Sequence, residues 1–204
     1  TRDLTTNSMI AAAAGADARM AGAPVSVVAN SGSGNQGITA TMPVVAAAHW
    51  LDIDEPTMLR AVTLSNLIAI RIKSKFGRLS NLCGATVAGT GAACGLVLMQ
   101  GGDPDDLART IRNMASSITG MICDGGNQGC VMKGVTAVDA AFRAATFARS
   151  GVAIDPVHGI NAPDPETTMR YMGRIASPGM VAPKRPLWTF SETKRWSKEK
   201  KPYG

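Results

Sequence analysis

The stretch GATVAGTGAACGLVLM, residues 84–99, decides the fold because it is the longest apolar run in the chain and contains no charged residue. Four glycines interrupt it, and it is shorter than the about 20 apolar residues that a membrane-spanning helix needs. We therefore expect it to form a helix buried in protein. Only nine of the 204 residues are aromatic, so small side chains let neighbouring helices pack closely. This composition predicts a mainly α fold, a compact Ala/Gly-rich helical domain with two glycine-rich functional loops.

Helix formers, caps and breakers predict further helices on both sides of this run. Alanine-rich or periodic apolar stretches end at Gly or Pro, and Asp54 and Asp103 stand at helix-capping positions. The expected helices cover residues 8–23, 38–51, 56–75, 79–99, 104–119 and 135–149, with a short one at 165–175. From residue 178 onward prolines, tryptophans and basic residues show no amphipathic period, so we predict no regular structure there. The chain thus divides into one helical domain, residues 1–180, and a basic irregular tail, residues 181–204.

Two glycine-rich segments interrupt the helical pattern, at residues 31–37 and 120–134, and both contain the tetrapeptide Gly-Asn-Gln-Gly. We expect both to be loops because they contain too many glycines for regular structure. The first precedes a helix, where hydroxyl groups, a carboxamide and unpaired backbone amides can bind a carboxylate or a phosphate. A plain connection of glycine and serine is the alternative. The candidate substrate-binding residues of this loop are Ser31, Gly32, Ser33, Gly34, Asn35, Gln36 and Gly37.

Three of the four cysteines lie beside or within glycine-rich segments, where the backbone can approach a bulky inorganic group. These three, Cys83, Cys123 and Cys130, are candidate metal ligands. The fourth, Cys94, lies inside the buried run and is expected to be a core residue, which is also the alternative interpretation for the other three. No two cysteines are closer than seven positions, so the CxxC spacing of a structural zinc site is missing.

Charge and motifs argue against several classes of function. Residues 1–183 contain 14 Lys/Arg and 13 Asp/Glu, whereas residues 184–204 contain seven and two. The net charge of +6 therefore belongs to the tail and does not indicate a nucleic-acid-binding face. The first loop lacks the Walker and GxGxxG patterns of nucleotide-binding proteins. His49 and His158 are the only histidines, and they do not favour a Ser/His/Asp triad.

We expect a cytoplasmic protein with neither a membrane nor a nucleic-acid partner. The chain opens at Thr1 without a basic n-region or a cleavage-like apolar segment, so no targeting signal is visible. It is expected to begin inside a longer polypeptide. Four irregularly spaced cysteines are too few for a disulfide scaffold and indicate reduced thiols or metal ligands.

Three strings of this sequence resemble the serine dehydratase-like alpha-chain family. They are SGSGNQGITATMPVVAAA at residues 31–48, IKSKFGRLSNLCGATVAGTGAACG at 72–95 and GMICDGGNQGCVMKGVTAVDAA at 120–141. The sequence resembles in particular the branch of L-cysteine desulfidases and related iron-sulfur lyases, over residues 1–180. It departs from the family at residues 126–127, where Gly-Asn stands in place of the usual Ala-Lys, and in the tail.

The resemblance implies that Cys83 and Cys123 ligate a 4Fe-4S cluster, that Cys130 supplies a third thiolate, and that residues 31–37 bind substrate. Three thiolates on four irons leave one iron open as a Lewis acid. The implied reaction is an α,β-elimination on a small amino acid. L-cysteine would give pyruvate, ammonia and sulfide, and L-serine would give pyruvate and ammonia.

Such an elimination needs a general base to remove the Cα proton. Lys133 and Asp124 are the neighbouring candidates, and a surface salt bridge or a helix cap is the alternative for each. Members of the desulfidase branch also carry an N-terminal region with a Glu-rich, Cys-containing motif. We therefore expect the chain to pair with an N-terminal partner segment or to form a homo-oligomer. The alternative function is a non-catalytic fragment or subunit that packs against that N-terminal part.

Overall fold

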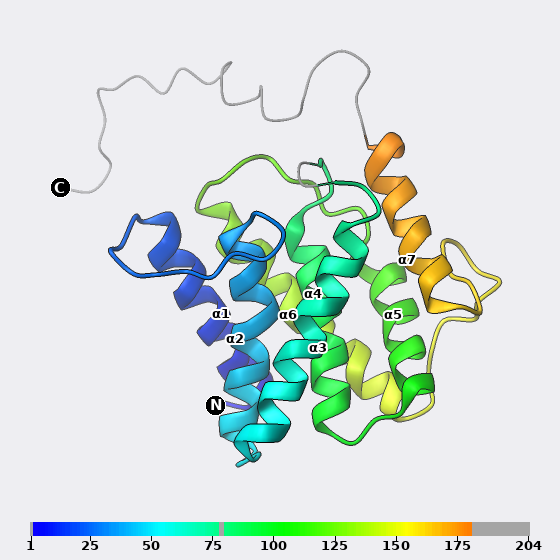
Figure 1. The fold of residues 1–204 in the computed structure, drawn as a ribbon, viewed down its shortest axis with the longest axis horizontal. Coiled ribbons are helices and arrows are strands. Elements are labelled where there is room, and N and C mark those ends of the chain that lie inside the picture. The colour runs from blue at the N-terminus through cyan, green and yellow to red at the C-terminus, as the bar shows by residue number, and fades with distance from the viewer. Residues whose placement is uncertain (1, 78–79, 181–204) are drawn as a thin grey trace.

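The computed structural model describes residues 2–77 and 80–180, which form helices joined by loops (Figure 1). The elements are α1 (Leu4–Met20), α2 (Gly34–Trp50), α3 (Glu55–Lys73), α4 (Gly84–Met99), α5 (Pro104–Ile118), α6 (Gly129–Arg149), α7 (Pro165–Arg174) and the π-helical turn η1 (Ile175–Gly179). No β-strand occurs in these two ranges, where only isolated backbone bridges are found. The predicted mainly α class is confirmed.

Helix α4 lies at the centre of the bundle and packs against α2, α3, α5 and α6. Most of its residues are buried, and its glycines let neighbouring backbones approach closely. A β-carbon at Gly91 would stand 2.1 Å from the carbonyl oxygen of Ser65 in α3. A β-carbon at Gly89 would stand 2.9 Å from the β-carbon of Ala137 in α6. These positions exclude a larger residue, so the glycines of α4 set the spacing between three helices.

Helix α2 begins earlier than predicted, inside the first glycine-rich segment. The Ser33 hydroxyl accepts a hydrogen bond from the Gln36 amide at 3.3 Å and so caps the first turn. The expectation that residues 34–37 are loop was therefore wrong. A side-chain cap at the right position outweighs the low helix propensity of glycine.

Helix α6 likewise begins at Gly129, six residues before the predicted start. The Gly129 amide donates a hydrogen bond to Asn127 Oδ1 at 2.7 Å, which satisfies one of the unpaired amides of the first turn. The second predicted loop is accordingly shorter than 120–134, and Cys130 belongs to a helix. Helix α4, in contrast, begins at Gly84 and not at residue 79.

The helices alternate in direction, so three connections lie together at one end of the bundle, in the upper part of Figure 1. They cover residues 21–33 before α2, residues 74–83 before α4 and residues 119–128 before α6. Residues 78–79 of the second connection lie outside the described part of the chain. The N-termini of α2, α4 and α6 consequently share this end with the cysteines of the second and third connections.

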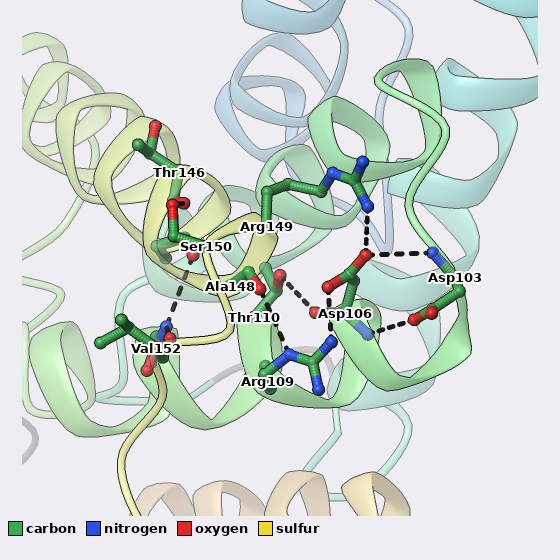
Figure 2. A network of polar contacts seen from close by, with 11 residues as sticks. Asp103, Asp106, Arg109, Thr110, Thr146, Ala148, Arg149, Ser150 and Val152 are labelled. Atoms are coloured by element: carbon green, nitrogen blue, oxygen red, sulfur yellow. Dashed lines mark hydrogen bonds and ion pairs between the residues drawn. The ribbon is translucent and has the colours of Figure 1, made fainter.

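At the other end of the bundle an ion network joins α5 to α6 (Figure 2). The buried Asp106 carboxylate pairs with Arg109 at 2.6 Å and with Arg149 at the end of α6. Asp103 and Asp106 also cap the first turn of α5 reciprocally. The hydrogen bond from Arg109 lowers the pKa of Asp106 to about 2. The network fixes the α5 N-terminus on α6, at the end of the bundle opposite the segments of Cys83 and Cys123.

The short predicted helix at 165–175 is present as α7, which packs against α3 and α5. Glu166 in its first turn pairs with Arg71 at 2.8 Å and with Lys75, both near the end of α3. The helices of the described ranges include none that is both long and apolar enough to cross a membrane. The predicted tail, residues 181–204, lies outside the described residues, and the domain boundary at residue 180 stays a prediction.

Candidate functional site

A short antiparallel backbone pairing brings two of the candidate ligands together. Leu82 and Ile122 form an isolated bridge. On one side of it the Cys83 amide donates to the Met121 carbonyl at 2.9 Å, and on the other the Cys123 amide donates to the Asn81 carbonyl at 2.7 Å. The connections before α4 and α6 are thus bound to each other next to two cysteines that are 40 positions apart in sequence.

Cys83 is the N-cap residue of α4 and is 7% exposed. Burial raises the pKa of its thiol, and the Ala85 backbone amide acts in the opposite direction. No side chain caps this helix end. The amides of the first turn and the positive end of the helix dipole oppose the effect of burial, but the pKa of the Cys83 thiol stays above its ordinary value.

Cys130 completes the group of cysteines from the first turn of α6. Its thiol donates to the Gly125 carbonyl at 3.5 Å, and its side chain is partly exposed, as is that of Cys123. Negative charge on Cys123 and on Cys130 contributes to raising the pKa of the Cys83 thiol, so the three sulfurs act on one another electrostatically. Loop glycines leave space beside them, because a β-carbon at Gly125 or Gly126 would meet nothing within 4 Å.

Cys94 has a different environment from the other cysteines. It is fully buried in α4 within the apolar cluster that also contains Ile72 and Met172. Burial raises the pKa of its thiol to about 12, so the thiol stays protonated at neutral pH. The core role expected for Cys94 is confirmed.

Lys73, the last residue of α3, is a charged member of this site that the sequence did not reveal. It is 6% exposed, its ammonium lies 4.6 Å from the centre of the Phe76 ring, and it donates to the Ser80 hydroxyl at 3.3 Å. Burial lowers the pKa of the Lys73 ammonium, whereas the charges of Cys123 and Cys83 raise it. A basic residue in the last turn of a helix is ordinary, so nothing in the sequence marks this one as buried.

The two candidates for the general base, Lys133 and Asp124, form an ion pair. Asp124 is half exposed, and the hydrogen bond from Lys133 lowers the pKa of its carboxyl group. Burial is the largest single effect and lowers the pKa of the Lys133 ammonium, but the hydrogen bond to Asp124 and the charges of Asp124, Cys83 and Cys130 together raise that pKa above its ordinary value. Within this pair neither group is a free base, so a catalytic role requires the pair to open; that role stays a prediction.

The first loop divides into an accessible and a buried part. Ser31 and Gly32 form a tight turn with positive φ angles of 51° and 87°, closed by two hydrogen bonds between Asn30 and Ser33. This turn and Ser33 are at least partly exposed, and so is Asn35. Gly34, Gln36 and Gly37 are buried. Only the accessible part of the predicted substrate-binding set can contact a ligand in this conformation.

Gln36 connects the first loop to the cysteine segments. Its side chain is 1% exposed, and Nε2 donates to Asn30 Oδ1 at 2.9 Å. Oε1 has no hydrogen-bond partner among the described residues and lies against Gly84, the residue after Cys83. A β-carbon at Gly84 would stand 2.8 Å from this oxygen. The first loop and the α4 N-terminus are therefore in direct contact.

The described residues do not form a ready site for a single metal ion. In residues 2–77 and 80–180 no three His, Cys, Asp or Glu side chains are close enough to hold one ion. A single zinc ion needs all its sulfur ligands at about 2.3 Å. A 4Fe-4S cluster instead binds each cysteine on a different iron, so its ligands stand farther apart. Cys83, Cys123 and Cys130 are all free, so each is available as a ligand.

Comparison with known proteins gives one family and a set of relatives. The family model of the serine dehydratase alpha chain matches residues 2–185. UPF0597 proteins of Oleidesulfovibrio alaskensis, Phocaeicola vulgatus and Klebsiella pneumoniae are 48%, 46% and 46% identical over 87%, 82% and 85% of this chain. The matches cover 42%, 39% and 41% of those relatives, so the chain spans about two fifths of their length. Their names state neither a reaction nor a ligand. No solved structure matches.

Proposed function

The chain belongs to the serine dehydratase alpha-chain family, and from this premise we propose that it is the cysteine-bearing part of an iron-sulfur-dependent lyase. One observation carries the proposal. The segments of Cys83, Cys123 and Cys130 meet at one end of the bundle, where the buried Lys73 supplies a positive charge. A buried lysine and three free cysteines gathered at one end of the bundle are unusual in an ordinary apolar core.

In this proposal each cysteine has a position suited to ligation. Cys83 is held rigidly by its backbone bond to Met121 and by the start of α4, whereas Cys123 and Cys130 flank a loop with open space. When bound, a 4Fe-4S cluster held by three cysteines supplies an open iron that acts as a Lewis acid on the substrate. Cys83, Cys123 and Cys130 would hold the cluster at the end of the bundle where the first loop also lies.

The accessible part of the first loop is the proposed substrate clamp. Ser31 and Ser33 offer hydroxyl groups, and the exposed turn at Gly32 lets a ligand approach the backbone. An amino-acid carboxylate is bound well by such hydroxyl and amide donors at a helix N-terminus. Gln36, which follows this loop, contacts Gly84, so that a movement of the loop would also displace Gly84 and the adjacent Cys83.

The proposed reaction is an α,β-elimination on L-serine or L-cysteine. Loss of the Cα proton and of hydroxide or hydrosulfide gives an aminoacrylate, which water converts to pyruvate and ammonia. Lys133 is the proposed acceptor of the proton, after its pair with Asp124 has opened and its ammonium has released a proton to solvent. We further propose a cytoplasmic location, which keeps the thiols reduced, and assembly as a homo-oligomer or with an N-terminal partner segment.

A second candidate function, a non-catalytic subunit that packs against an N-terminal domain, is favoured by one surface. Leu59, Leu67 and Ile70 lie along α3 and are 53%, 56% and 47% exposed. A row of exposed apolar side chains on one helix is typical of an interface. This surface is compatible with both functions, whereas bound iron is expected only of the lyase.

Anaerobic purification followed by iron and acid-labile sulfide analysis tests the proposal. The lyase function predicts about four irons per chain, with a matching amount of sulfide. A chain that stays free of iron after reconstitution would support the subunit function. Elimination assays with L-serine and L-cysteine, performed in parallel on the same preparation, then distinguish the two substrates.

A further inference from the structure

Asn30, the residue before the tight turn of the first loop, has a hydrogen-bond partner for every polar group. It is 4% exposed, and its backbone amide and carbonyl pair with Ser33 at 3.1 and 3.0 Å. Nδ2 donates to Oδ1 and to the backbone carbonyl of Asn66 in α3, at 2.8 and 3.2 Å. Oδ1 accepts from Gln36 Nε2 and from the Ser31 hydroxyl, each at 2.9 Å. One buried amide thus joins the turn to α2 and α3.

The orientation of the Asn30 amide follows from carbonyl groups that can only accept. Asn66 Nδ2 donates to the Val62 carbonyl at 3.0 Å, which turns Asn66 Oδ1 toward Asn30. Asn30 must therefore offer Nδ2 to Asn66, whose backbone carbonyl also only accepts. Asn30 Oδ1 is consequently on the side of Ser31. Because this oxygen has no hydrogen, the Ser31 hydroxyl has to donate its own.

The two serines of the loop therefore present opposite polarity to a ligand. The Ser31 hydroxyl has given its hydrogen to Asn30 and offers a ligand only lone pairs. The Ser33 hydroxyl accepts from the Gln36 amide at 3.3 Å and keeps its hydrogen for another acceptor. Both serines are partly exposed, so a ligand can reach them. Ser31 thus suits a group that donates, and Ser33 suits a group that accepts.

A positive charge marks the Ser33 side of the loop. The Arg19 guanidinium of α1 lies against Gly34, the residue after Ser33, where it would overlap a β-carbon. None of the salt bridges formed by the described residues includes Arg19. A carboxylate is negative and accepts hydrogen bonds, whereas an ammonium is positive and only donates them. The Ser33 side therefore suits a carboxylate, and the Ser31 side suits an ammonium.

We propose that Asn30 is a positioning residue that fixes the Ser31 hydroxyl as an acceptor for the ammonium of a zwitterionic α-amino acid. The carboxylate of the same molecule then lies on the side of Ser33 and Arg19. The inference rests on the proposed function for the claim that a small amino acid binds at this loop. It adds the direction in which that amino acid lies. Asn30 acts through Ser31 and does not contact the ligand.

The test uses three small compounds and single variants of the loop. L-serine has both charged groups, ethanolamine lacks the carboxylate, and β-hydroxypropionate lacks the ammonium. Their dissociation constants are measured by isothermal titration calorimetry on the chain after anaerobic reconstitution, and the iron content of the same sample is determined. Ser31→Ala removes the acceptor, and its matched control Ser33→Ala removes the donor. Asn30→Leu removes Oδ1, whereas Asn30→Asp keeps an oxygen toward Ser31 and loses only the donor to Asn66.

We expect Ser31→Ala to raise the dissociation constants of L-serine and ethanolamine about fivefold to tenfold and to leave that of β-hydroxypropionate within about twofold. Ser33→Ala should give the converse, with weaker binding of L-serine and β-hydroxypropionate. Asn30→Leu should shift the ratio of the two single-charge compounds about threefold or more toward β-hydroxypropionate, because the released Ser31 hydroxyl can then donate. Asn30→Asp should show no such shift. A merely structural Asn30 would weaken both compounds alike and leave their ratio unchanged.

Three results would overturn the inference. They are equal weakening of ethanolamine and β-hydroxypropionate by Ser31→Ala, an unchanged ratio in an Asn30→Leu chain that circular dichroism shows to be folded, and no binding of any of the three compounds to the unmodified chain. Should Asn30→Leu not fold, Asn30→Asp decides. A shift of its ratio toward β-hydroxypropionate by more than about twofold contradicts the role of Asn30, and a smaller shift or one toward ethanolamine supports it.

The iron content separates this inference from the proposed function. A chain without iron that shows the crossed pattern of the two serine variants would defeat the lyase function and keep the orientation of the amino acid. A chain that binds iron but lacks the crossed pattern would keep the proposed function and defeat the roles of Asn30 and Ser31.

Discussion

The side chain of Gln36 lies directly against Gly84, so that a β-carbon at Gly84 would stand 2.8 Å from Gln36 Oε1. Gln36 lies in the first turn of α2, next to the loop proposed to bind substrate, and Gly84 follows the first proposed cluster ligand, Cys83. The two halves of the candidate site therefore meet at one van der Waals contact. Two predictions test this contact from its two sides.

The first prediction concerns Gly84→Ala. Alanine has a higher helix propensity than glycine, which alone would raise the free energy of unfolding by about 1 kcal/mol. We expect the steric overlap with Gln36 to outweigh this gain, so that the free energy of unfolding falls by about 1–3 kcal/mol. Urea unfolding followed by circular dichroism measures the difference. Gly126→Ala is the control, because a β-carbon there meets nothing within 4 Å. An unchanged or raised stability of Gly84→Ala would show that the contact is loose.

The second prediction uses the repeated tetrapeptide Gly-Asn-Gln-Gly. Gln36→Leu leaves the buried Asn30 Oδ1 without the Nε2 donor and should destabilise the chain by about 1–3 kcal/mol. Gln128, at the same place in the second copy, is exposed, so Gln128→Leu should stay within about 0.5 kcal/mol of the unmodified chain. Similar unfolding midpoints for the two variants would contradict the connecting role of Gln36.

The third prediction concerns acid stability and the network in Figure 2. The pKa of Asp106 is lowered from 3.8 to about 2, mainly by the hydrogen bond from Arg109. The ionised Asp106 carboxylate therefore stabilises the fold at neutral pH. This contribution is complete above pH 4 and is lost as the pH falls from about 4 to about 2, where Asp106 becomes protonated in the folded state.

Urea midpoints between pH 2 and pH 7 measure this loss. The difference between the unmodified chain and Asp106→Asn should be largest above pH 4 and shrink toward pH 2. Asp105→Asn, at an exposed neighbour, serves as the control for the general loss of negative charge. A difference between Asp106→Asn and the unmodified chain that does not vary with pH would contradict the role of the ionised carboxylate.

The fourth prediction separates catalysis from structure at the Lys133–Asp124 pair. If Lys133 accepts the Cα proton, Lys133→Met should lower kcat by about 10²–10⁴-fold and leave the iron content unchanged. Asp124→Asn removes the partner that raises the pKa of Lys133, so the pH profile of kcat should move to lower pH. Full activity of Lys133→Met would exclude Lys133 as the base. These measurements use a preparation that shows elimination activity.

The helices were largely predictable from the sequence, but the starting points of α1, α2, α4 and α6 were not. Glycine-rich composition favoured loops at residues 34–37 and 129–134. The Ser33 side chain instead caps a helix that starts at Gly34, and the Asn127 side chain accepts from the first amide of a helix that starts at Gly129. A cap depends on one hydrogen bond, which composition does not show. The described residues therefore contain the expected α-helices in the expected order, but several of these helices begin at other residues than predicted.

The candidate site was predictable only in part for a similar reason. Glycine-rich surroundings identified the cysteines that the bundle brings together and separated them from Cys94. Lys73 is buried because α3 packs against the connection before α4. Gln36 is buried and Gln128 is exposed because only the first turn of α2 packs against that connection. Identical tetrapeptides thus have different environments, and only the fold distinguishes them.

The iron content of single cysteine variants tests the central claim most directly. After anaerobic reconstitution, Cys83→Ala, Cys123→Ala and Cys130→Ala should each lose most of the iron that the unmodified chain binds, because a cluster needs every one of its three thiolates. Cys94→Ala, in the core, should keep it. Retention of the full iron content by any of the first three variants, or its loss in Cys94→Ala, would contradict the proposed cluster site.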